Sequence, residues 1–425
     1  MRAPRTAFAP RTSAAPDAAL GRGEFVAMMA VLISSVAFSI DAMLPALPRI
    51  AADLTPQAVN RAQMVLTSFV LGLGIGTFVA GPLADRFGRK ATIIAGMALY
   101  ALAALAAAAA PTLEWLLALR LLQGIGAAGP RIASLALVRD LYQGRQMAQI
   151  TSFIMTIFIL VPALAPSVGA VIMAIAGWRG IFPAFALFGL TGAAWLALRQ
   201  PETLPPERRR PLRLRPLRQA VREVVGHRLV RLYIAVLALG FGQMFAVLSA
   251  IQQIYDVTFG IRESFPLWLM GSALLSGGGT LINARLVVRL GMRRLAIAAY
   301  ATQTVLSAAL LAAMWAGAIP AHLAFPAFYL WTISVFFMAG LTFGNLNALA
   351  LQPMGHIAGT ASSVIGAIST VGAVAIAAPI GLAFDGTPAP LIAGTFACSA
   401  LAWILMRRAR DADPAPKTTP PPAGV

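Results

Sequence analysis

The chain of 425 residues is 59% hydrophobic, only 11% of its residues are charged, and its mean hydropathy is +0.78. A soluble domain carries about 25% charged residues, so this composition excludes a soluble domain and predicts a protein embedded in a lipid bilayer. The formal net charge of +18 would suit a nucleic-acid-binding protein, but the basic residues lie in short stretches between apolar runs, so we expect no nucleic-acid partner.

Twelve apolar runs follow an N-terminal stretch that is rich in Ala, Pro and Arg. Each run approaches the ~20 residues that an α-helix needs to cross the hydrocarbon core of a bilayer. The sequence therefore predicts an all-α membrane protein with twelve transmembrane helices. The predicted spans are 25–47, 62–83, 91–110, 114–138, 148–174, 180–198, 229–254, 264–286, 295–316, 324–349, 359–384 and 388–406. Gly277, Gly278 and Gly279 interrupt the eighth run, so its boundaries are the least defined.

The most charged stretch divides the twelve spans into six and six. We expect an N-terminal bundle over 24–199 and a C-terminal bundle over 229–408, joined by a basic cytoplasmic linker over 200–228. Residues 1–23 and the Pro-rich residues 409–425 are predicted to be disordered cytoplasmic tails.

The basic residues also predict the orientation of the chain. Most of the 33 Lys and Arg residues fall on one side of the predicted spans; the exceptions are Arg49, Arg61, Arg179 and Arg262 opposite and two within spans. Basic loops stay on the cytoplasmic side of a membrane, so both termini are predicted to be cytoplasmic.

The two predicted bundles carry an internal repeat. Arg289 to Arg293 follows the eighth span as Arg86 to Lys90 follows the second, 203 residues earlier. The second copy lacks an acid, because Val288 stands where Asp85 stands in the first. This duplication predicts two pseudo-symmetric six-helix bundles.

The decapeptide between the second and third spans reads Gly81-Pro82-Leu83-Ala84-Asp85-Arg86-Phe87-Gly88-Arg89-Lys90. Its charges and its helix-breaking glycine belong at the membrane surface, so we expect a tight connection there. The pattern resembles the signature loop between the second and third helices of major facilitator superfamily transporters.

This resemblance implies that Gly81, Asp85, Arg86, Gly88, Arg89 and Lys90 form a conformational switch. Asp85 would contact the start of the eleventh span near Gly359 in the outward-facing state and would release it in the inward-facing state. Arg89 would be its charge partner. The alternative is that the loop is only a determinant of membrane topology.

Further motifs resemble one branch of the superfamily, the Bcr/CflA drug:proton antiporters. They are Ser39 to Pro48 in the first span, Leu119 to Gly126 in the fourth, Val161 to Gly169 in the fifth and Pro201 to Arg208 after the sixth. The fifth-span segment, with Pro162, Pro166 and Gly169, resembles the antiporter motif, but Ala165 and Ala170 replace usual glycines. The resemblance implies multidrug efflux from a monomer in the inner membrane, driven by protons.

Asp41 is the acid that the pattern places firmly inside a span. A carboxylate there costs ~2.5 kcal/mol or more on insertion scales, so such a residue is normally kept for function or neutralised. We interpret Asp41 as the proton carrier; the alternative is a hydrated acid near the outer end of the first span.

Arg120 and Arg131 both lie in the fourth span, eleven residues apart. This separation is three helical turns with about 20° of drift, so both are expected to face the cavity. The resemblance implies that Arg120 communicates with the proton site; the alternative is a structural arginine bonded to backbone carbonyls. Arg131 is a candidate for attracting anionic or carbonyl-bearing substrates; the alternatives are snorkelling or packing.

Polar and aromatic side chains of the seventh and tenth spans are candidates for the substrate cavity, although aromatic residues in spans more often pack or face lipid. The candidates are Phe241, Gln243, Phe245, Gln252, Trp331, Phe343 and Asn345.

No cofactor, metal site or enzymatic activity is predicted. His227, His322 and His356 have no ligand spacing, and the single Cys398 lies in the last apolar run. Gly72, Gly74 and Gly76 could suggest a phosphate loop, but inside an apolar run Gly72 and Gly76 indicate a helix-packing seam.

The sequence therefore predicts a proton-coupled exporter of small amphiphilic compounds. Two alternatives stay open: a transporter dedicated to one metabolite such as a purine, amino acid or sugar, and a non-transporting scaffold on the same fold. A cavity rich in polar contacts would favour the first alternative, and the charged loop with Asp41 argues against the second.

Overall fold

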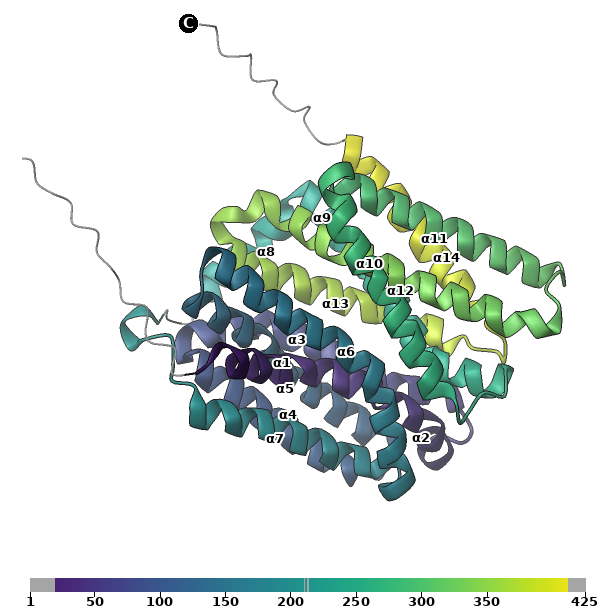
Figure 1. The fold of residues 1–425 in the computed structure, drawn as a ribbon, viewed down its shortest axis with the longest axis horizontal. Helices are drawn as coiled ribbons and strands as arrows, with labels where there is room; N and C mark the ends of the chain where they lie inside the picture. Colours follow the sequence, from purple (N-terminus) through teal and green to yellow (C-terminus); the bar gives the residue numbers. More distant parts are fainter. Residues whose placement is uncertain (1–19, 210, 212–213, 412–425) are drawn as a thin grey trace, which may run out of the picture.

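The computed structural model describes residues 20–209, 211 and 214–411, and within these ranges the chain is helical without strands (Figure 1). Most of both predicted tails, residues 1–19 and 412–425, and residues 210, 212 and 213 of the predicted linker lie outside the described residues.

The helices of the first half are α1 (Arg22–Asp41), α2 (Leu47–Leu54), α3 (Met64–Phe87), α4 (Arg89–Ala108), α5 (Leu113–Leu141), α6 (Gly144–Ala176) and α7 (Ile181–Arg199). A short amphipathic helix, α8 (Leu214–Gly226), precedes those of the second half, which are α9 (Arg228–Gln253), α10 (Phe265–Leu290), α11 (Met292–Trp315), α12 (Ala321–Leu351), α13 (Ala358–Leu382) and α14 (Ala389–Asp411).

Eleven helical runs in the described chain are long and apolar enough to cross a membrane. The longest, Ala321–Leu382, contains two helices, α12 and α13, joined by a 3₁₀ segment. The described chain therefore provides the twelve predicted spans, with α2 and α8 as additional short helices at opposite ends of the molecule (Figure 1).

The packing of the two halves shows the predicted pseudo-symmetry. In the first half α3 and α4 pack on α5, α4 packs on α7, and α1 packs on α5, α6 and α7. In the second half α10 and α11 pack on α12, α11 packs on α14, and α9 packs on α12, α13 and α14. Every pair of the first half thus recurs between the corresponding helices of the second.

The contacts between the halves repeat in the same way. The second span of the first half packs on the fifth of the second half, as α3 on α13, and the converse pair is α10 on α6. Figure 1 shows the first half below and the second half above, with the spans running from the end that carries α8 to the end that carries α2. We call these the α8 end and the α2 end.

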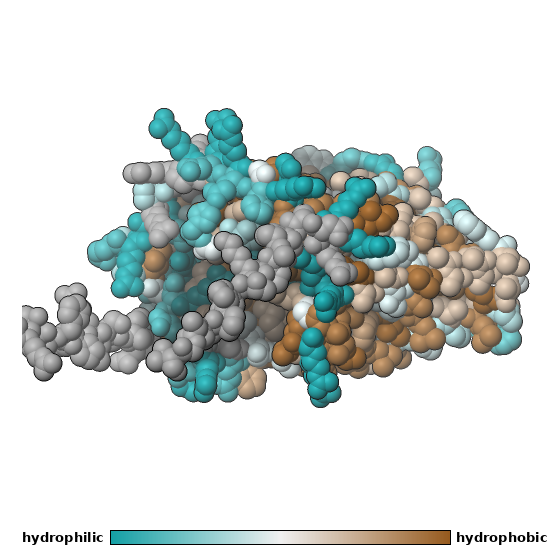
Figure 2. Space-filling model, turned by 90° about the horizontal axis from the view of Figure 1, so that it is seen from above, coloured by the Kyte–Doolittle hydropathy of each residue, from teal (hydrophilic) through white to brown (hydrophobic). Residues whose placement is uncertain are grey.

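Hydrophilic side chains gather at the α8 end, and apolar side chains cover much of the rest of the visible face (Figure 2). Apolar residues such as Leu198, Ile175 and Leu281 are exposed on the spans to more than 70%. An apolar girdle that ends at a charged surface is the pattern of a protein surrounded by lipid.

Two predicted boundaries are wrong. The segment from Gly81 to Phe87 is not a loop, because α3 continues through Pro82 and ends only at Gly88, whose φ is 102°. Pro82 lies inside this helix and removes one backbone hydrogen bond. Prolines are tolerated in membrane-spanning helices because neighbouring groups satisfy the freed carbonyl. Asp85 and Arg86 therefore lie on the last helical turn.

The first span also differs from its prediction, because it does not run unbroken to residue 47. α1 ends at Asp41, and a 3₁₀ turn over Leu44–Ala46 leads into α2. Pro45 and Pro48 lie at the starts of these two elements, where the missing N–H is tolerated.

The internal repeat is visible in the backbone at the turn after each second span. Gly88 and Gly291 both have positive φ, 102° and 79°, and each separates two spans at the same place in its half. Glycine adopts this conformation without steric cost. Gly277–Gly279, in contrast, lies within the continuous helix α10.

The predicted packing seam of α3 is confirmed. A Cβ atom at Gly72 would overlap the carbonyl oxygen of Leu121 in α5, and one at Gly124 would overlap the carbonyl oxygen of Phe69 in α3. A Cβ at Gly76 would lie 2.7 Å from the carbonyl oxygen of Ile125. Small residues therefore bring these two backbones into direct contact, as expected for helices packed in lipid.

We expect Gly124→Ala to lower the thermal midpoint of the purified protein, because the added methyl group must push α3 away from α5. Overpacking of this kind costs about 1–3 kcal/mol. The matched control is Gly344→Ala in α12, where an added Cβ meets nothing within 4 Å. Equal midpoints for the two variants would contradict the direct backbone contact.

Candidate functional site

A cavity of about 430 Å³ lies between the two halves. Its first-half wall comes from α1, α3, α5 and α6, and its second-half wall from α9, α10, α12 and α13. The volume falls within the range of about 300–1,000 Å³ that holds drug-sized ligands. The residues that matter for its chemistry are Asp41, Arg131, Phe158, Pro162, Phe241, Met244, Phe245, Phe336, Phe343 and Thr370.

Asp41 lies on this wall at the last residue of α1, where the helix gives way to the 3₁₀ turn. The residue is 5% exposed, and its carboxyl group has no hydrogen-bond or ion-pair partner among the described residues. The free carbonyls of a helix C-terminus add negative potential there. A carboxyl group in these surroundings does not stabilise the fold, which is the setting of acids retained for function in membrane proteins.

The antiporter-like segment of α6 packs against the end of α1, next to Asp41. A Cβ at Gly169 would overlap the carbonyl oxygen of Ala42, the residue after Asp41. Pro162 lines the cavity two turns earlier, and Pro166 is buried between them. Pro162 therefore shares the cavity wall with Asp41, and Gly169 contacts the residue that follows Asp41.

Arg120 occupies the interior of the first half and is fully buried. Its guanidinium group donates to the carbonyl oxygens of Val65 (3.2 Å) and Ser39 (3.0 Å) and to Oε1 of Gln123 (2.7 Å). The group also lies over the ring of Phe69, at 4.4 Å from its centroid. Two of these partners are backbone carbonyls, as expected if Arg120 has a structural role.

The expectation that Arg120 and Arg131 face one cavity is therefore wrong for Arg120. Its long side chain turns into the contact of α5 with α1 and α3, where carbonyl oxygens offer partners, whereas Arg131 lies on the cavity wall. Arg120 is nevertheless connected to the backbone near Asp41, because its guanidinium group donates to the carbonyl oxygen of Ser39, two residues before Asp41. The hydroxyl group of Ser39 lies 2.5 Å from that of Tyr100.

Of the candidates in the second half, Phe241, Phe245 and Phe343 line the cavity. The ring centroids of Phe241 and Phe343 are 4.2 Å apart, and those of Phe241 and Phe245 are 6.3 Å apart. The three rings come from α9 and α12 and form one aromatic surface. Phe336, one heptad before Phe343 on α12, belongs to the same wall. Its spacing could have identified it from the sequence.

The other candidates lie elsewhere, which corrects the sequence-based expectation. Gln243 accepts a hydrogen bond from Ser399 of α14 (2.8 Å), Trp331 donates to Ser307 of α11 (3.0 Å), and Asn345 donates to Asn283 of α10 (2.7 Å). A buried polar group in a span needs a partner, and each of these side chains finds it on a neighbouring helix of its own half.

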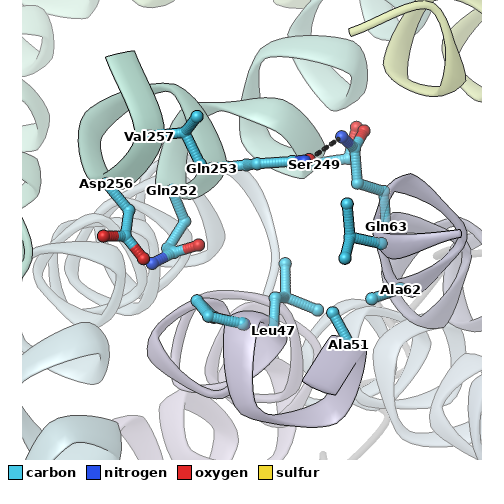
Figure 3. A pocket seen from close by; sticks show the side chains of 11 residues that line it. Leu47, Ala51, Ala62, Gln63, Ser249, Gln252, Gln253, Asp256 and Val257 are labelled. Atoms are coloured by element: carbon cyan, nitrogen blue, oxygen red, sulfur yellow. Dashed lines mark hydrogen bonds between the residues drawn. The ribbon is translucent and has the colours of Figure 1, made fainter. Parts of the chain in front are cut away.

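Gln252 lines a second, smaller cavity of about 140 Å³ at the α2 end. Figure 3 shows it beside Asp256 and opposite Leu47 and Ala51 of the first half. Near them Gln63 donates to Oε1 of Gln253 (2.7 Å), the contact drawn as a dashed line.

Neutral amides join the two halves at the α2 end. In addition to the contact of Gln63 with Gln253, Asn60 donates to the carbonyl oxygens of Leu382 (3.1 Å) and Phe384 (2.7 Å). Gln253 donates in turn to Oδ1 of Asn60 (2.7 Å). Among the described residues, these contacts between the halves are therefore hydrogen bonds between uncharged groups.

Charged side chains gather at the α8 end around the turn at Gly88. Arg89 pairs with Asp85 at 2.5 Å and with Asp140, at the end of α5, at 3.0 Å. The side chain of Arg89 is 12% exposed. Glu202 accepts hydrogen bonds from the backbone N–H groups of Arg89 (2.9 Å) and Lys90 (3.0 Å) at the start of α4.

The predicted ion pair of Asp85 with Arg89 is present, but two further carboxylates of this cluster were not predicted as site residues. Glu202 is the carboxylate at the N-terminus of α4, where the helix dipole favours negative charge. Asp140 could have been suspected, because it lies at the end of a span next to Arg139 and Arg145.

The resemblance assigns a contact with α13 to Asp85. In the structure α3 contacts α13 one turn earlier, at Gly81. A Cβ at Gly81 would lie 3.1 Å from Oγ of Ser363, near the start of α13. Of the other loop residues, Arg86 lies over the ring of Phe87, and Lys90 donates to the carbonyl oxygen of Ala197.

Two matching six-helix halves around a central cavity define a multi-pass membrane transporter fold. Residues 28–378 match the model of the Major Facilitator Superfamily, and the chain belongs to this family. It is 31% identical over 392 residues to a bicyclomycin resistance protein homolog of Haemophilus influenzae, a match that covers 90% of this chain and 96% of that protein. The chain therefore resembles the Bcr/CflA branch.

Another relative is also named for resistance to a drug, and solved structures share the fold. A chloramphenicol resistance protein of Pseudomonas aeruginosa is 36% identical over 165 residues, 38% of this chain and 39% of that protein. Among solved structures, a D-xylose-proton symporter matches with a TM-score of 0.68 and 17% identity over 90% of this chain and 97% of that chain. At this identity the structural match supports the fold alone.

Proposed function

We propose that this transporter exports small amphiphilic compounds across the inner membrane in exchange for protons. The observation that carries the proposal is the position of Asp41, an unpaired carboxyl group on the wall of a drug-sized cavity between the two halves. A carboxyl group there binds either a proton or a substrate cation, which couples the two in opposite directions.

The wall of the cavity favours amphiphilic compounds over a polar metabolite. Apart from Asp41 and Arg131, its described residues are mainly aliphatic and aromatic, with few hydroxyl groups. A sugar or purine carries many hydrogen-bonding groups, and each of them would need a partner in a buried site. Relatives named for resistance to bicyclomycin and chloramphenicol support the same choice.

Alternating access follows from the pseudo-symmetric halves rocking around this cavity. The contacts of Asn60, Gln63 and Gln253 at the α2 end would have to break in the outward-facing state. The charged cluster around Arg89 at the α8 end would reorganise in the opposite phase. We propose that one chain performs the cycle as a monomer.

The orientation of the chain in the membrane is part of the proposal. The basic surface of the α8 end would face the cytoplasm together with both termini. A reporter fused after Arg218, in α8, should be cytoplasmic, and one inserted within 257–263, between α9 and α10, should be periplasmic. Finding both reporters on one side would contradict this orientation.

Transport into everted membrane vesicles tests the function. Vesicles with the protein should accumulate a panel of amphiphilic drugs when a proton gradient is imposed, and a protonophore should abolish the accumulation. Uptake of one polar metabolite, with no drug accumulated, would instead support the dedicated transporter.

A further inference from the structure

Two opposite charges face the central cavity without a partner in the described protein. Asp41 projects from α1 and Arg131 from α5, so both belong to the first half. No ion pair within 4.0 Å and no hydrogen bond joins either group to another described residue or to one another.

These two unpaired charges differ from Arg120, the fully buried arginine of the same half. Arg120 has three oxygen acceptors and an aromatic face, which together solvate its guanidinium group. Among the described residues, Arg131 has no such set of acceptors. It is half-buried on the cavity wall, where water or a ligand can complete the hydrogen bonds of its guanidinium group.

The wall opposite the two charges is aromatic. Phe241, Phe245, Phe336 and Phe343 present their rings from α9 and α12 of the second half. The cavity thus has one face with a negative and a positive group and one face for a flat apolar body.

Charge balance then selects the substrate, on the basis of the proposed antiport. Substrate binds when Asp41 has released its proton, and in that state the wall carries one negative and one positive charge. A cationic drug would pair with Asp41 but leave Arg131 uncompensated, and an anionic drug would do the reverse. A molecule with both charges satisfies both groups.

We infer that the cavity is built for zwitterionic amphiphiles with an aromatic body. The ammonium group pairs with the carboxylate of Asp41, the anionic group pairs with the guanidinium of Arg131, and the aromatic body packs on the phenylalanine wall. Arg131 thereby determines specificity, whereas Asp41 serves both binding and proton exchange.

Binding of three forms of one compound tests this inference. The probes are a fluoroquinolone zwitterion such as ciprofloxacin, its methyl ester, which is a cation, and its N-acetyl derivative, which is an anion. Affinities are measured near neutral pH with the purified full-length protein in lipid nanodiscs. The zwitterion should bind about tenfold or more tightly than either derivative, since each derivative leaves one charge-assisted contact unmade.

Variants of Arg131 separate specificity from folding. Arg131→Gln should abolish the advantage of the zwitterion over the ester while the ester still binds, which shows that the variant is folded. Arg131→Lys should keep most of the advantage, because the positive charge remains. Arg179→Gln, at an exposed arginine next to α7, is the matched control and should behave as wild type.

The outcomes distinguish this inference from the proposed function. Equal affinities for the three probes, or an equal loss for all three in Arg131→Gln, would overturn the zwitterion inference but leave drug–proton exchange in vesicles unaffected. Selective binding of the zwitterion together with transport that ignores a protonophore would support the site and overturn the proton coupling.

Discussion

Replacing Asp41 by Asn is expected to abolish proton-driven transport while the protein remains in the membrane. The side chain makes no contact that holds the described fold together, so its loss should not lower stability. Asn has nearly the same shape but cannot carry a proton or form an ion pair. The measurement is drug-driven proton movement in proteoliposomes, and we expect at least a tenfold loss.

Glu114→Gln is the matched control for this variant. Glu114 is an acid at the α2 end whose side chain is 64% exposed and pairs with Arg61 at 2.9 Å. An exposed pair of this kind contributes little, so proton coupling should stay at the wild-type level. Full coupling in Asp41→Asn would show that another group carries the proton.

One exchangeable proton also predicts the charge moved per cycle. Asp41 is the one acid on the described wall of the cavity, so a single proton should enter for each substrate exported. Export of a neutral or zwitterionic compound would then move one net charge inward and respond to the membrane potential at about 2.3 kcal/mol per 100 mV. Exchange with the potential clamped by potassium and valinomycin measures this, and two protons per such substrate would refute it.

Replacing Asp85 by Asn is expected to slow transport without destabilising the protein. In the described conformation Asp85 is 46% exposed and pairs with Arg89, which keeps Asp140 as a second partner, so the fold should tolerate the loss. The state in which Asp85 approaches the start of α13 would lose a charge–dipole contact of ~1 kcal/mol, which corresponds to a rate about fivefold lower.

The rate is measured in everted vesicles at equal amounts of protein. Glu207→Gln serves as control, since Glu207 is an exposed acid of the same side of the protein. A wild-type rate for Asp85→Asn would leave the charged turn with only a role in topology.

The number and order of the spans could be predicted because the bilayer imposes a simple length rule. Every span needs about 20 apolar residues, and the charged turns between spans show where each ends. The length rule does not fix the last residue of a helix. α3 continues past Pro82 to Phe87, beyond the predicted end of its span. α1 stops at Asp41 although apolar residues follow.

The cavity was predicted less well, because lipid hides the amphipathic signal. In water a buried face is apolar and an exposed face is polar, but in a membrane both faces are apolar. Gln243 and Asn345 therefore look like cavity residues in the sequence, yet they bond to neighbouring helices. A charge in a span faces either a cavity or internal partners, so the expectation held for Asp41 and Arg131 but failed for Arg120, which bonds to backbone carbonyls.

Neutral amides join the two halves at the α2 end, whereas the charged cluster at the α8 end lies within the first half and its linker. The amide groups of Asn60, Gln63 and Gln253 have no proton to gain or lose over the range in which bacteria grow. In the proposed orientation they face the periplasm, whose acidity follows the surroundings, whereas the carboxylates around Arg89 face the buffered cytoplasm. In a cell that moves into acid, the amide contacts between the halves at the α2 end would therefore stay unchanged while the proton supply that drives transport would rise.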